Sequence, residues 1–457
     1  MSSKNEQDVA IKDSPAALVI GGGIAGMQAA LDIADAGFKV YLVEREPSIG
    51  GRMAQLDKTF PTLDCSSCIL TPKMVDVGRH SNIELLTYSE VVDLQGQVGG
   101  FQVKVKKKPR YVHEELCTGC GLCVEACVWK KIPSEFDAGV TMRSAAYIQF
   151  PQAVPLKAVI DEKTCLYLVK GKCGRKCEQA CDAGAIDFEM QEELVDLHVG
   201  AVIVATGFDP FDPHLKPELG YDYPNVITAL EFERLSSASG PTAGKITLNG
   251  KEPKDVVFIQ CVGSRDQTVG NEYCSRVCCM YTAKQAHLVG ERIPKAHVTV
   301  FYMDVRAFGK GYEEFYDRVK REGVRYRRGS VSEIYKRGDR VVVRAEDTLL
   351  GEPLEVEADM VVLATGVVPR ADVEDVAGLL DLERSPDGFF AEAHPKMRPV
   401  DTARDGVYLA GCCQGPKDIP DTVAQAKAAA SSTIVVLRQL NIQYLASGVL
   451  DGSFKQS

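Results

Sequence analysis

The hydrophobic pattern predicts a strand, a glycine-rich turn and a helix near the start of the chain. Residues 16–20 (AALVI) are apolar and lead directly into the GGGIAG run at 21–26. An alanine-rich stretch with helical spacing continues to about Ala36, and a second apolar run, 39–43, ends at Glu44. This order predicts a β-α-β unit of a parallel sheet.

The rest of the pattern predicts an α/β fold with interruptions. Strand-like alternation near 84–105 gives way, between about 110 and 185, to a cysteine-, glycine- and proline-rich stretch with little periodicity. A polar tail is expected at 1–14. Apolar strands and one long helix return later in the chain, and they are expected at 200–206, 255–260, 360–366 and 406–410 (strands) and from about 422 to 440 (helix).

The first turn carries the spacing of a dinucleotide-binding fingerprint, Gly21-x-Gly23-x-x-Gly26, between a strand and a helix. Gly21 would allow the tight turn, Gly23 the approach of a pyrophosphate, and Gly26 the close packing of helix on strand. The helix N-terminus would then face the negative phosphates. Glu44 is placed to accept hydrogen bonds from ribose hydroxyls. An ordinary glycine-rich turn is the alternative, and the flanking strand, helix and Glu44 disfavour it.

Further motifs favour FAD over NAD. They resemble the second Gly-Gly, the ATG strand ends and the final flavin motif of glutathione- and thioredoxin-reductase flavoproteins. In the final motif Cys412-Cys413 replaces the usual Asp, which leaves the ribityl contact open. The N-terminus of the last helix, expected just after 418–421, could face the flavin pyrimidine ring, although a plain surface helix is the alternative. The motif residues are Gly50-Gly51-Arg52, Thr206-Gly207, Thr365-Gly366 and the 406–411 run ending in Gly411.

The second α/β segment has no glycine fingerprint of its own. Its first strand leads into Cys261-Val262-Gly263-Ser264-Arg265. We therefore expect that the chain does not take hydride from a nicotinamide by itself. Besides two cysteine runs in the 110–185 stretch, Cys261 belongs to a third cysteine group, which could hold a cluster or consist of buried thiols. The spacing of Cys274 and Cys278 in this group places them one helical turn apart. This group is Cys261, Cys274, Cys278 and Cys279.

Composition narrows the function class. The formal net charge of −10 disfavours a nucleic-acid partner. No apolar stretch is long enough for a membrane span, and the N-terminus has no apolar signal region, so a cytoplasmic location is expected. The 16 cysteines stand in tight runs within a long chain, which is typical of metal ligands in a reducing compartment.

Two cysteine runs predict two [4Fe–4S] clusters. The first has the ferredoxin spacing, and the second is stretched and lacks the usual proline. By the cross-over rule of two-cluster ferredoxins, one cluster would use Cys117, Cys120, Cys123 and Cys181. The other would use Cys165, Cys173, Cys177 and Cys127. One intact cubane only, or a zinc in the second site, is the alternative. Cys65-x2-Cys68 and Cys412-Cys413 stay open between a dithiol, further cluster ligands and inert packing.

Taken together, the chain closely resembles the flavin-carrying HdrA family of heterodisulfide reductases. Long, specific stretches carry the resemblance, namely VIGGGIAGMQAALDIAD (19–35), FPTLDCSSCILTPKM (60–74), CTGCGLCVEAC (117–127), FPQAVPLKAVID (150–161), CVGSRDQTVGNEYCSRVCCMYTAKQA (261–286) and YLAGCCQGPKDIPDTVAQAKAAAS (408–431).

The resemblance implies a Rossmann-like FAD-binding core of thioredoxin-reductase type with an inserted ferredoxin-like two-cluster domain. It implies flavin-based electron bifurcation with FAD as the branch point. The implied partners are HdrB- and HdrC-like proteins, an electron-donor module and ferredoxin, and the chain would form a homodimer within this larger complex. It also implies a third [4Fe–4S] cluster on the third cysteine group. Lys284 and Glu231 would lie near flavin N5, paired or relaying a proton. Surface helix residues are the alternative for both.

The expected division is three parts of one FAD-binding domain, 15–105, 191–245 and 367–445, interrupted by the ferredoxin-like insert 106–190 and a cluster-carrying segment, 246–366. Larger family members carry an additional N-terminal domain and a C-terminal ferredoxin domain, which this sequence lacks. A non-bifurcating electron-relay subunit of a quinone- or sulfur-compound-linked complex is therefore the main rival. A nicotinamide-dependent diflavin-type reductase ranks third and a non-catalytic cluster scaffold last.

Overall fold

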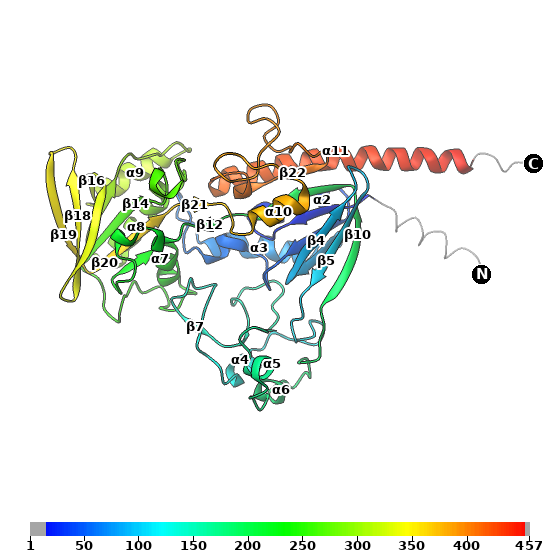
Figure 1. Ribbon diagram of the computed structural model, residues 1–457, viewed down its shortest axis with the longest axis horizontal. Coiled ribbons are helices and arrows are strands. Elements are labelled where there is room, and N and C mark those ends of the chain that lie inside the picture. The colour runs from blue at the N-terminus through cyan, green and yellow to red at the C-terminus, as the bar shows by residue number, and fades with distance from the viewer. Residues whose placement is uncertain (1–14, 453–457) are drawn as a thin grey trace, which may run out of the picture.

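The computed structural model describes residues 15–452, with side chains up to 442 (Figure 1). The tail expected at 1–14 lies outside the described residues. Two α/β halves lie side by side, and a smaller segment with short helices hangs below the N-terminal half in this view (Figure 1). In the described part, no helix is both long and apolar enough to cross a membrane.

The first half is built on a five-stranded parallel sheet in the order β22-β11-β1-β2-β3. Helices α2, α3 and α11 cover one face, where alanines such as Ala29, Ala30, Ala426 and Ala429 let α2 and α11 approach closely. A three-stranded sheet, β10-β5-β4, covers the other face. The bounds are β1 Ala17–Ile20, α2 Ile24–Asp35, β2 Val40–Glu44, α3 Ser66–Arg79, β3 Ile83–Thr87, β4 Ser89–Gln95, β5 Phe101–Lys107, β10 Glu193–Val199, β11 Ala201–Val204, α10 Val373–Leu380, β22 Val407–Leu409 and α11 Ile419–Gly452.

The second half repeats the parallel arrangement with the order β13-β20-β14-β15-β16. Alternation along β14 turns Val256 and Phe258 toward α7, α8 and α9, and Val257 and Ile259 toward a three-stranded antiparallel sheet. The bounds are β13 Val226–Thr228, α7 Ala229–Ser236, β14 Asp255–Val262, α8 Cys278–Arg292, β15 His297–Tyr302, α9 Tyr312–Arg321, β16 Arg325–Arg328, β17 Val331–Arg337, β18 Arg340–Asp347, β19 Glu352–Ala358 and β20 Met360–Thr365.

Two short strands join the halves. β12 (Asp209–Pro210) follows β11 of the first sheet, and β21 (Val367–Val368) follows β20 of the second. They pair antiparallel, so the chain crosses between the halves twice at the same place. This crossing fixes the carboxyl ends of the two parallel sheets near each other.

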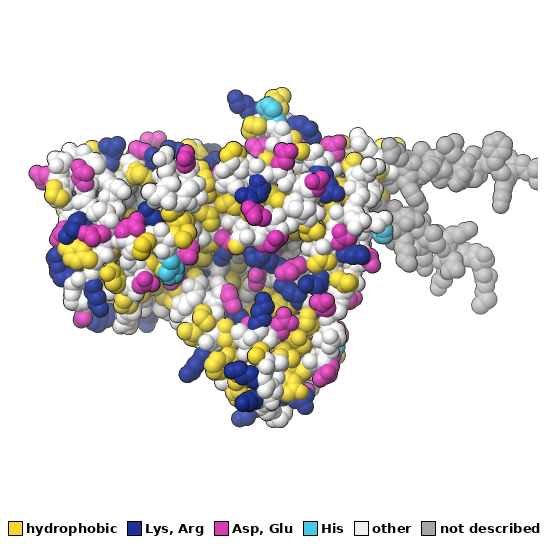
Figure 2. All heavy atoms as spheres, in the orientation of Figure 1, with side chains coloured by type: hydrophobic (Ala, Val, Ile, Leu, Met, Phe, Trp, Pro, Cys, Tyr) yellow, Lys and Arg dark blue, Asp and Glu magenta, His cyan; other side chains and the backbone are white. Residues whose placement is uncertain are grey.

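The segment between β5 and β10 contains short helices and two small hairpins. Figure 2 shows basic, acidic and hydrophobic side chains mixed on the face of it that is turned to the viewer. Its bounds are α4 Leu122–Ala126, β6 Ile132–Pro133, β7 Met142–Arg143, β8 Ala146–Tyr147, β9 Val159–Ile160, α5 Leu166–Lys170 and α6 Lys176–Gln179. Its small core includes three buried cysteines, Cys123, Cys165 and Cys177.

Two sequence expectations are corrected. The last helix begins at Ile419, inside the segment expected to precede it, because Pro420 is tolerated in a first helical turn, where its nitrogen needs no partner. Helix α8 begins at Cys278, so Cys274 lies in the preceding loop and not one helical turn away. Arg276, with a φ of 62°, keeps the loop from continuing the helix backward.

Candidate functional site

One large cavity, about 840 Å³, lies where the two halves and the insert meet. The glycine loop after β1 forms one wall, and α7 and α8 of the second half form another. Glu135, Phe136 and Phe150 of the insert reach it, as does the start of α11. Three parts of the chain that are distant in sequence therefore share one binding space.

The three fingerprint glycines differ in the space beside them. A Cβ atom on Gly21 would lie 2.3 Å from the Ala205 carbonyl oxygen, and one on Gly26 would lie 1.8 Å from the Gly21 oxygen. A Cβ atom on Gly23 would meet no protein atom within 4 Å. Gly23 lines the cavity, so the space beside it is left to whatever the cavity binds. Gly26 does not line the cavity and serves the helix–strand contact.

Glu44 closes one end of the glycine loop. Its carboxylate accepts hydrogen bonds from the backbone N–H of Gly22 at 2.6 Å and of Glu46 at 2.8 Å. Burial raises the pKa of Glu44 to about 7, against these hydrogen bonds, which lower it. The side chain lines the cavity, so it can still accept a further hydrogen bond from a ribose hydroxyl.

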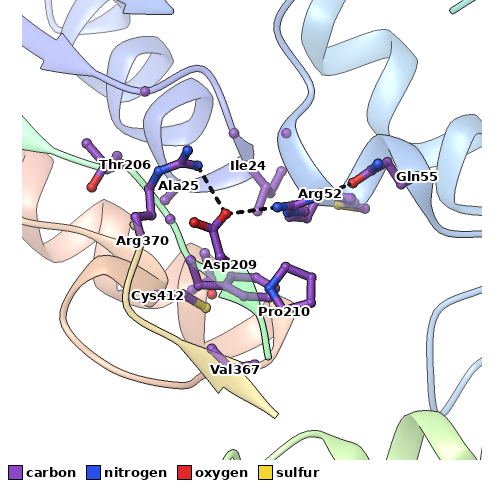
Figure 3. A pocket seen from close by; sticks show the side chains of 18 of the residues that line it. Ile24, Ala25, Arg52, Gln55, Thr206, Asp209, Pro210, Val367, Arg370 and Cys412 are labelled. Carbon is purple, nitrogen blue, oxygen red and sulfur yellow. Dashed lines mark hydrogen bonds and ion pairs between the residues drawn. The ribbon is translucent and has the colours of Figure 1, made fainter. Parts of the chain in front are cut away.

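Two arginines, Arg52 and Arg370, lie on either side of Asp209 (Figure 3). The Asp209 carboxylate lies 3.0 Å from Arg52 Nη2 and 3.9 Å from Arg370 Nη1, and Arg52 also donates to Gln55. Because Asp209 belongs to β12, this network ties the crossing strands to the Gly50-Gly51-Arg52 turn. Gly51 packs against the fingerprint loop, since its Cβ atom would lie 2.9 Å from the Gly23 Cα atom.

The ATG motifs and the final motif also reach the cavity. Thr206, Gly207 and Gly366 line it, whereas Gly411 packs behind it, where a Cβ atom would lie 2.9 Å from Ala25. Gly411 has a φ of 78°, a conformation that favours glycine. The residue after it, Cys412, lines the cavity.

Lys417 is a cavity residue that the sequence patterns did not indicate. Its ammonium donates to Gln414 Oε1 at 2.6 Å and to the Gly415 carbonyl at 3.0 Å. Burial lowers its pKa. Asp418, Ile419 and Pro420 line the same wall, so a lysine and a helix N-terminus converge on one end of the cavity.

Lys284 and Glu233 form a buried ion pair at the cavity wall, and this corrects the expectation that Glu231 pairs with Lys284. The Lys284 ammonium donates to the Glu233 carboxylate and, at 3.0 Å, to the Lys58 carbonyl. The Glu233 carboxylate also accepts from the Asp57 N–H at 3.0 Å. Both side chains are almost fully buried, at 2% and 3% exposure.

Glu231 instead caps helix α7. Its side chain accepts a hydrogen bond from the backbone N–H of Thr228, while the Thr228 hydroxyl accepts one from the Glu231 N–H. This reciprocal capping box needs a Thr and a Glu three residues apart. The pattern is visible in the sequence, and it could have assigned Glu231 to the helix start and left Glu233 as the partner of Lys284. Glu231 does not line the cavity.

The insert brings its eight cysteines together in two groups. Burial raises the pKa of Cys123 to about 12, and the neighbouring thiols that add to the shift are Cys117, Cys181, Cys120 and, least of the four, Cys177. Burial also raises the pKa of Cys177 to about 11, and its neighbours are Cys127, Cys165 and Cys173. The last four all line one small void. Each group thus takes one cysteine from the other run.

The third cysteine group lies at the end of β14 and the start of α8. The Cys278 thiol hydrogen-bonds with both Cys261 and Cys279, which lowers the pKa of Cys261 and lowers that of Cys279 to about 7. Arg265 is close to Cys261 and to Cys274. Cys261, Cys278 and Cys279 therefore lie together at the carboxyl end of β14, the central strand of the second sheet, and Arg265 lies between this group and Cys274.

These donor sets are made of thiols alone. Within 15–452, no group of three or more His, Cys, Asp or Glu side chains is arranged to hold one metal ion. A cubane spreads its four thiolates over separate corners, and thiolates are the ligands that iron–sulfur clusters take. The cavity likewise suits a flavin dinucleotide, because Gly23 leaves room for a pyrophosphate and Glu44 stands ready for a ribose.

Known proteins resemble the chain over nearly its whole length. The model of the pyridine nucleotide-disulphide oxidoreductase family matches residues 15–431. The HdrA-type component of the H(2):CoB-CoM heterodisulfide,ferredoxin reductase of Methanothermobacter marburgensis is 55% identical, over 92% of this chain and 63% of that protein. An HdrA-type iron-sulfur component of the CoB--CoM heterodisulfide reductase of Methanopyrus kandleri is 52% identical, over 96% of this chain and 67% of that protein. The chain thus spans about two thirds of their length or less.

Among solved structures, the thioredoxin reductase of T. acidophilum matches with a TM-score of 0.52, at 16% identity over 92% of this chain and 97% of that chain. The Lactococcus lactis thioredoxin reductase matches with the same TM-score of 0.52, at 13% identity, over 93% and 99%. At such identities the likeness concerns the fold, and it confirms the predicted Rossmann-like core of thioredoxin-reductase type.

Proposed function

Because the chain belongs to the pyridine nucleotide-disulphide oxidoreductases and to the HdrA family of heterodisulfide reductases, we propose that it is an electron-transferring oxidoreductase subunit with FAD and [4Fe–4S] clusters. One observation carries the proposal. Helix α8 begins with Cys278 and Cys279 of the third cysteine group and, one to two turns on, presents Tyr281 and Lys284 to the cavity. A single helix thus links a thiol cluster to a flavin-sized cavity.

The residues of the first half would hold FAD. Gly21, Gly23 and Gly26 would shape the turn over the pyrophosphate, Glu44 would bind the adenosine ribose, and the other motif residues would line the rest. FAD, when bound, supplies chemistry that exchanges electrons in pairs or singly. The other residues expected to contact it are Gly51, Arg52, Thr206, Gly207 and Gly366. Gly411, expected from the sequence to contact it as well, packs behind the cavity against Ala25 and would act only through the shape of the wall.

Three cysteine sets would hold [4Fe–4S] clusters, which supply one-electron carriers. Two lie in the insert and combine both runs, and the third lies at the start of α8. The proposed ligands are Cys117, Cys120, Cys123 and Cys181 for one insert cluster, Cys165, Cys173, Cys177 and Cys127 for the other, and Cys261, Cys274, Cys278 and Cys279 for the third. Helix α8 adjoins the cavity, and the insert reaches it through Glu135, Phe136 and Phe150 rather than through its cysteines.

The Lys284–Glu233 pair would set the charge at the cavity wall. Lys284 brings a cation to it, and Glu233 and the Lys58 carbonyl hold that cation in one position. The Gln285 amide in turn donates to the Glu233 carboxylate. A fixed positive charge stabilises negative charge that develops nearby when electrons arrive. Glu231, assigned to a catalytic role by the sequence, would act on this site only by starting α7 correctly.

The finer proposal is flavin-based electron bifurcation in a cytoplasmic complex with HdrB- and HdrC-like proteins, an electron-donor module and ferredoxin, in which this chain forms a homodimer. We divide the chain into the FAD-binding parts 15–105, 191–245 and 367–445, the insert 106–190 and the cluster-carrying segment 246–366. A non-bifurcating relay subunit is the second candidate, because an electron-transferring subunit with these cofactors need not split electron pairs.

A redox titration of the anaerobically prepared holoprotein tests the proposal. For a bifurcating flavin we expect the flavin spectrum to change in one two-electron step. Two well-separated one-electron steps over a wide range of potential would instead support the relay. Rapid bleaching of the flavin by NADPH alone would contradict both, since neither takes electrons directly from a nicotinamide.

A further inference from the structure

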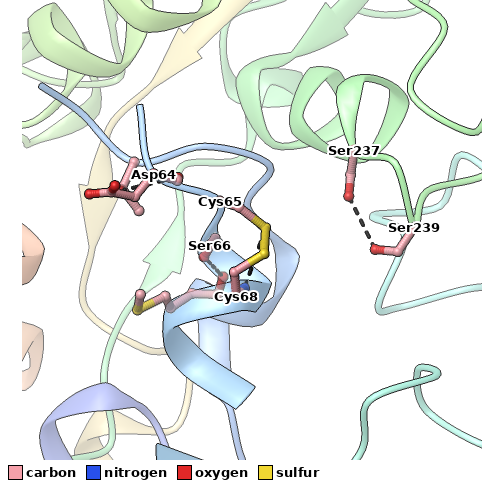
Figure 4. Close-up of a disulfide and its surroundings, with 8 residues drawn as sticks. Asp64, Cys65, Ser66, Cys68, Ser237 and Ser239 are labelled. Atoms are coloured by element: carbon pink, nitrogen blue, oxygen red, sulfur yellow. Dashed lines mark hydrogen bonds between the residues drawn. A yellow bond between two sulfur atoms is a disulfide. The ribbon is translucent and has the colours of Figure 1, made fainter. Parts of the chain in front are cut away.

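Cys65 and Cys68 form a disulfide at the start of helix α3 (Figure 4), apart from all three proposed cluster sites. Their Cα atoms lie 5.3 Å apart, a separation that a disulfide spans without moving the backbone. The other cysteines of the described residues form no disulfide. This pair is therefore the place in the described chain where two cysteines are already joined.

The pair does not face the flavin cavity. Lys58, Thr59 and Phe60 line the cavity, but neither cysteine does. Cys68 is exposed at the surface and Cys65 is half-buried. An electron donor for the disulfide would thus approach from solvent, and its first contact would be the Cys68 sulfur.

The local structure makes Cys65 the better leaving group. Cys65 is the N-cap of α3, and its sulfur accepts a hydrogen bond from the Cys68 backbone N–H at 3.3 Å. A thiolate at a helix N-terminus is stabilised by such a donor and by the helix dipole. Ser66, between them, is turned inward and donates to the Met53 carbonyl at 2.7 Å, which anchors the helix start (Figure 4).

The pair is also connected to the cavity wall through the backbone. Cys65 forms an antiparallel bridge with Lys58, and the Ser66 N–H donates to the Asp57 carbonyl at 2.9 Å. The Lys58 carbonyl accepts from Lys284, and the Asp57 N–H donates to Glu233. The strand that runs beside Cys65 is therefore the one that the buried Lys284–Glu233 pair holds.

We propose that Cys65 and Cys68 are a thiol–disulfide exchange site for an external dithiol, and that the state of the pair alters the backbone at 57–60. A thiolate of the dithiol attacks Cys68 Sγ, breaks the Cys65–Cys68 bond and releases Cys65 as a thiolate. The second thiol of the donor then displaces Cys68 from the mixed disulfide. The pair gains two electrons and two protons, and the dithiol loses both and becomes a cyclic disulfide.

Differential alkylation of the iron- and flavin-loaded full chain tests the exchange. The protein is equilibrated anaerobically with mixtures of reduced and oxidised dithiothreitol, and mass spectrometry then counts labels on peptide 59–73. We expect the labels to rise from none to two in one reversible transition. In Cys68→Ser, Cys65 should be labelled at every ratio. Ser67→Ala, a control within the same turn, should keep the transition of the natural sequence.

Two results would overturn the exchange site. Two free thiols at every ratio would mean that the cysteines are inert packing. A pair that stays unlabelled at every ratio, and becomes labelled only when a chelator removes iron, would mean that they are cluster ligands. Amide hydrogen exchange tests the link between the pair and the cavity wall. On reduction of the disulfide we expect faster exchange at 57–60, and no such change in Cys68→Ser. Unchanged exchange at 57–60 on reduction of the natural sequence would refute the link.

Discussion

The two α/β halves use the same position in the fold in different ways. In the first half, β1 passes in three residues to α2, and Gly21 and Gly26 bring their backbones so close that neither accepts a Cβ atom. In the second half, β14 ends at Val262 and α8 begins only at Cys278. Cys261 adopts a left-handed φ of 62° near the end of the strand.

The two halves share the place of their binding residues, the carboxyl end of a parallel strand, although the motifs at that place differ. Parallel sheets place binding residues at the carboxyl ends of their strands. A short glycine loop there leaves room for phosphate, whereas a long loop with cysteines on both sides brings thiols together. The halves then complement each other, because their strand ends are joined at the crossing of β12 and β21.

Removing the close approach in the first half should have the largest effect on FAD binding. Gly26→Ala would place a Cβ atom 1.8 Å from the Gly21 oxygen, and we expect at least about a tenfold loss of FAD affinity, or about 1.4 kcal/mol. Gly23→Ala meets no protein atom, so it should keep the fold and still weaken FAD. Flavin fluorescence after reconstitution measures both.

Gly290→Ala is the matched control, since a Cβ atom there also meets nothing within 4 Å and the residue lies in α8 of the second half. It should bind FAD normally. If Gly23→Ala binds FAD as tightly as Gly290→Ala, the pyrophosphate does not lie against the fingerprint loop.

Breaking the buried ion pair should have the largest effect on the stability of the fold. Lys284→Met leaves the buried Glu233 carboxylate without its cation, which costs about 3–5 kcal/mol of stability. Thermal unfolding of the anaerobic holoprotein should show a clearly lower midpoint. Lys295→Met, an exposed lysine of the same half, is the control. Equal midpoints for the two variants would show that the pair does not stabilise the site.

FAD affinity should depend on pH through Glu44. Its pKa near 7 in the FAD-free protein means that it is largely protonated below that value. Ribose hydroxyls donate to the ionised carboxylate, so binding releases a proton. Affinity should therefore rise, by about tenfold at most per pH unit, between pH 6 and 7 and level off above. Glu44→Gln should remove this dependence, and a persistent slope would contradict the assignment.

The same shift affects stability without FAD. Because burial raises the pKa of Glu44 in the folded chain above the ordinary value of 4.5, the folded state binds the proton more tightly than the unfolded state. The FAD-free protein should thus lose stability from this group as the pH rises from about 4.5 to 7.

The smallest expected effects distinguish the helix-capping role of Glu231 from the ion-pairing role of Glu233. Thr228→Ala removes one half of the capping box and should cost about 0.5–2 kcal/mol of stability. Glu231→Gln keeps a capping side chain and should leave the flavin potential unchanged, while Glu233→Gln should shift it. A flavin potential that moves equally in both glutamine variants would restore Glu231 as a site residue.

Local patterns predicted much of the fold. The strand, loop and helix from β1 to β2 follow from periodicity and glycine spacing within a few dozen residues, and so does β14. The start of α11 was misplaced because Pro420 can end or begin a helix, and only the tertiary context decides between the two.

The site was predictable where the residues needed fixed spacing. Cysteine runs and the Gly21–Gly26 fingerprint carry their spacing in the sequence. The partner of Lys284 has no such fixed spacing, because α7 and α8 are brought together only by packing on the second sheet. Glu231 and Glu233 are also only two positions apart on one short helix, so the sequence does not separate their roles easily. Lys417 likewise reaches the cavity only through the fold.

The central claim is that a cluster stands where the second half has no nicotinamide fingerprint. The most direct test counts iron and FAD per chain in anaerobically purified protein and in the Cys261→Ser/Cys278→Ser double variant. We predict about twelve irons and one FAD, falling to about eight irons with FAD retained in the variant. An iron count that is the same in both proteins would contradict the claim.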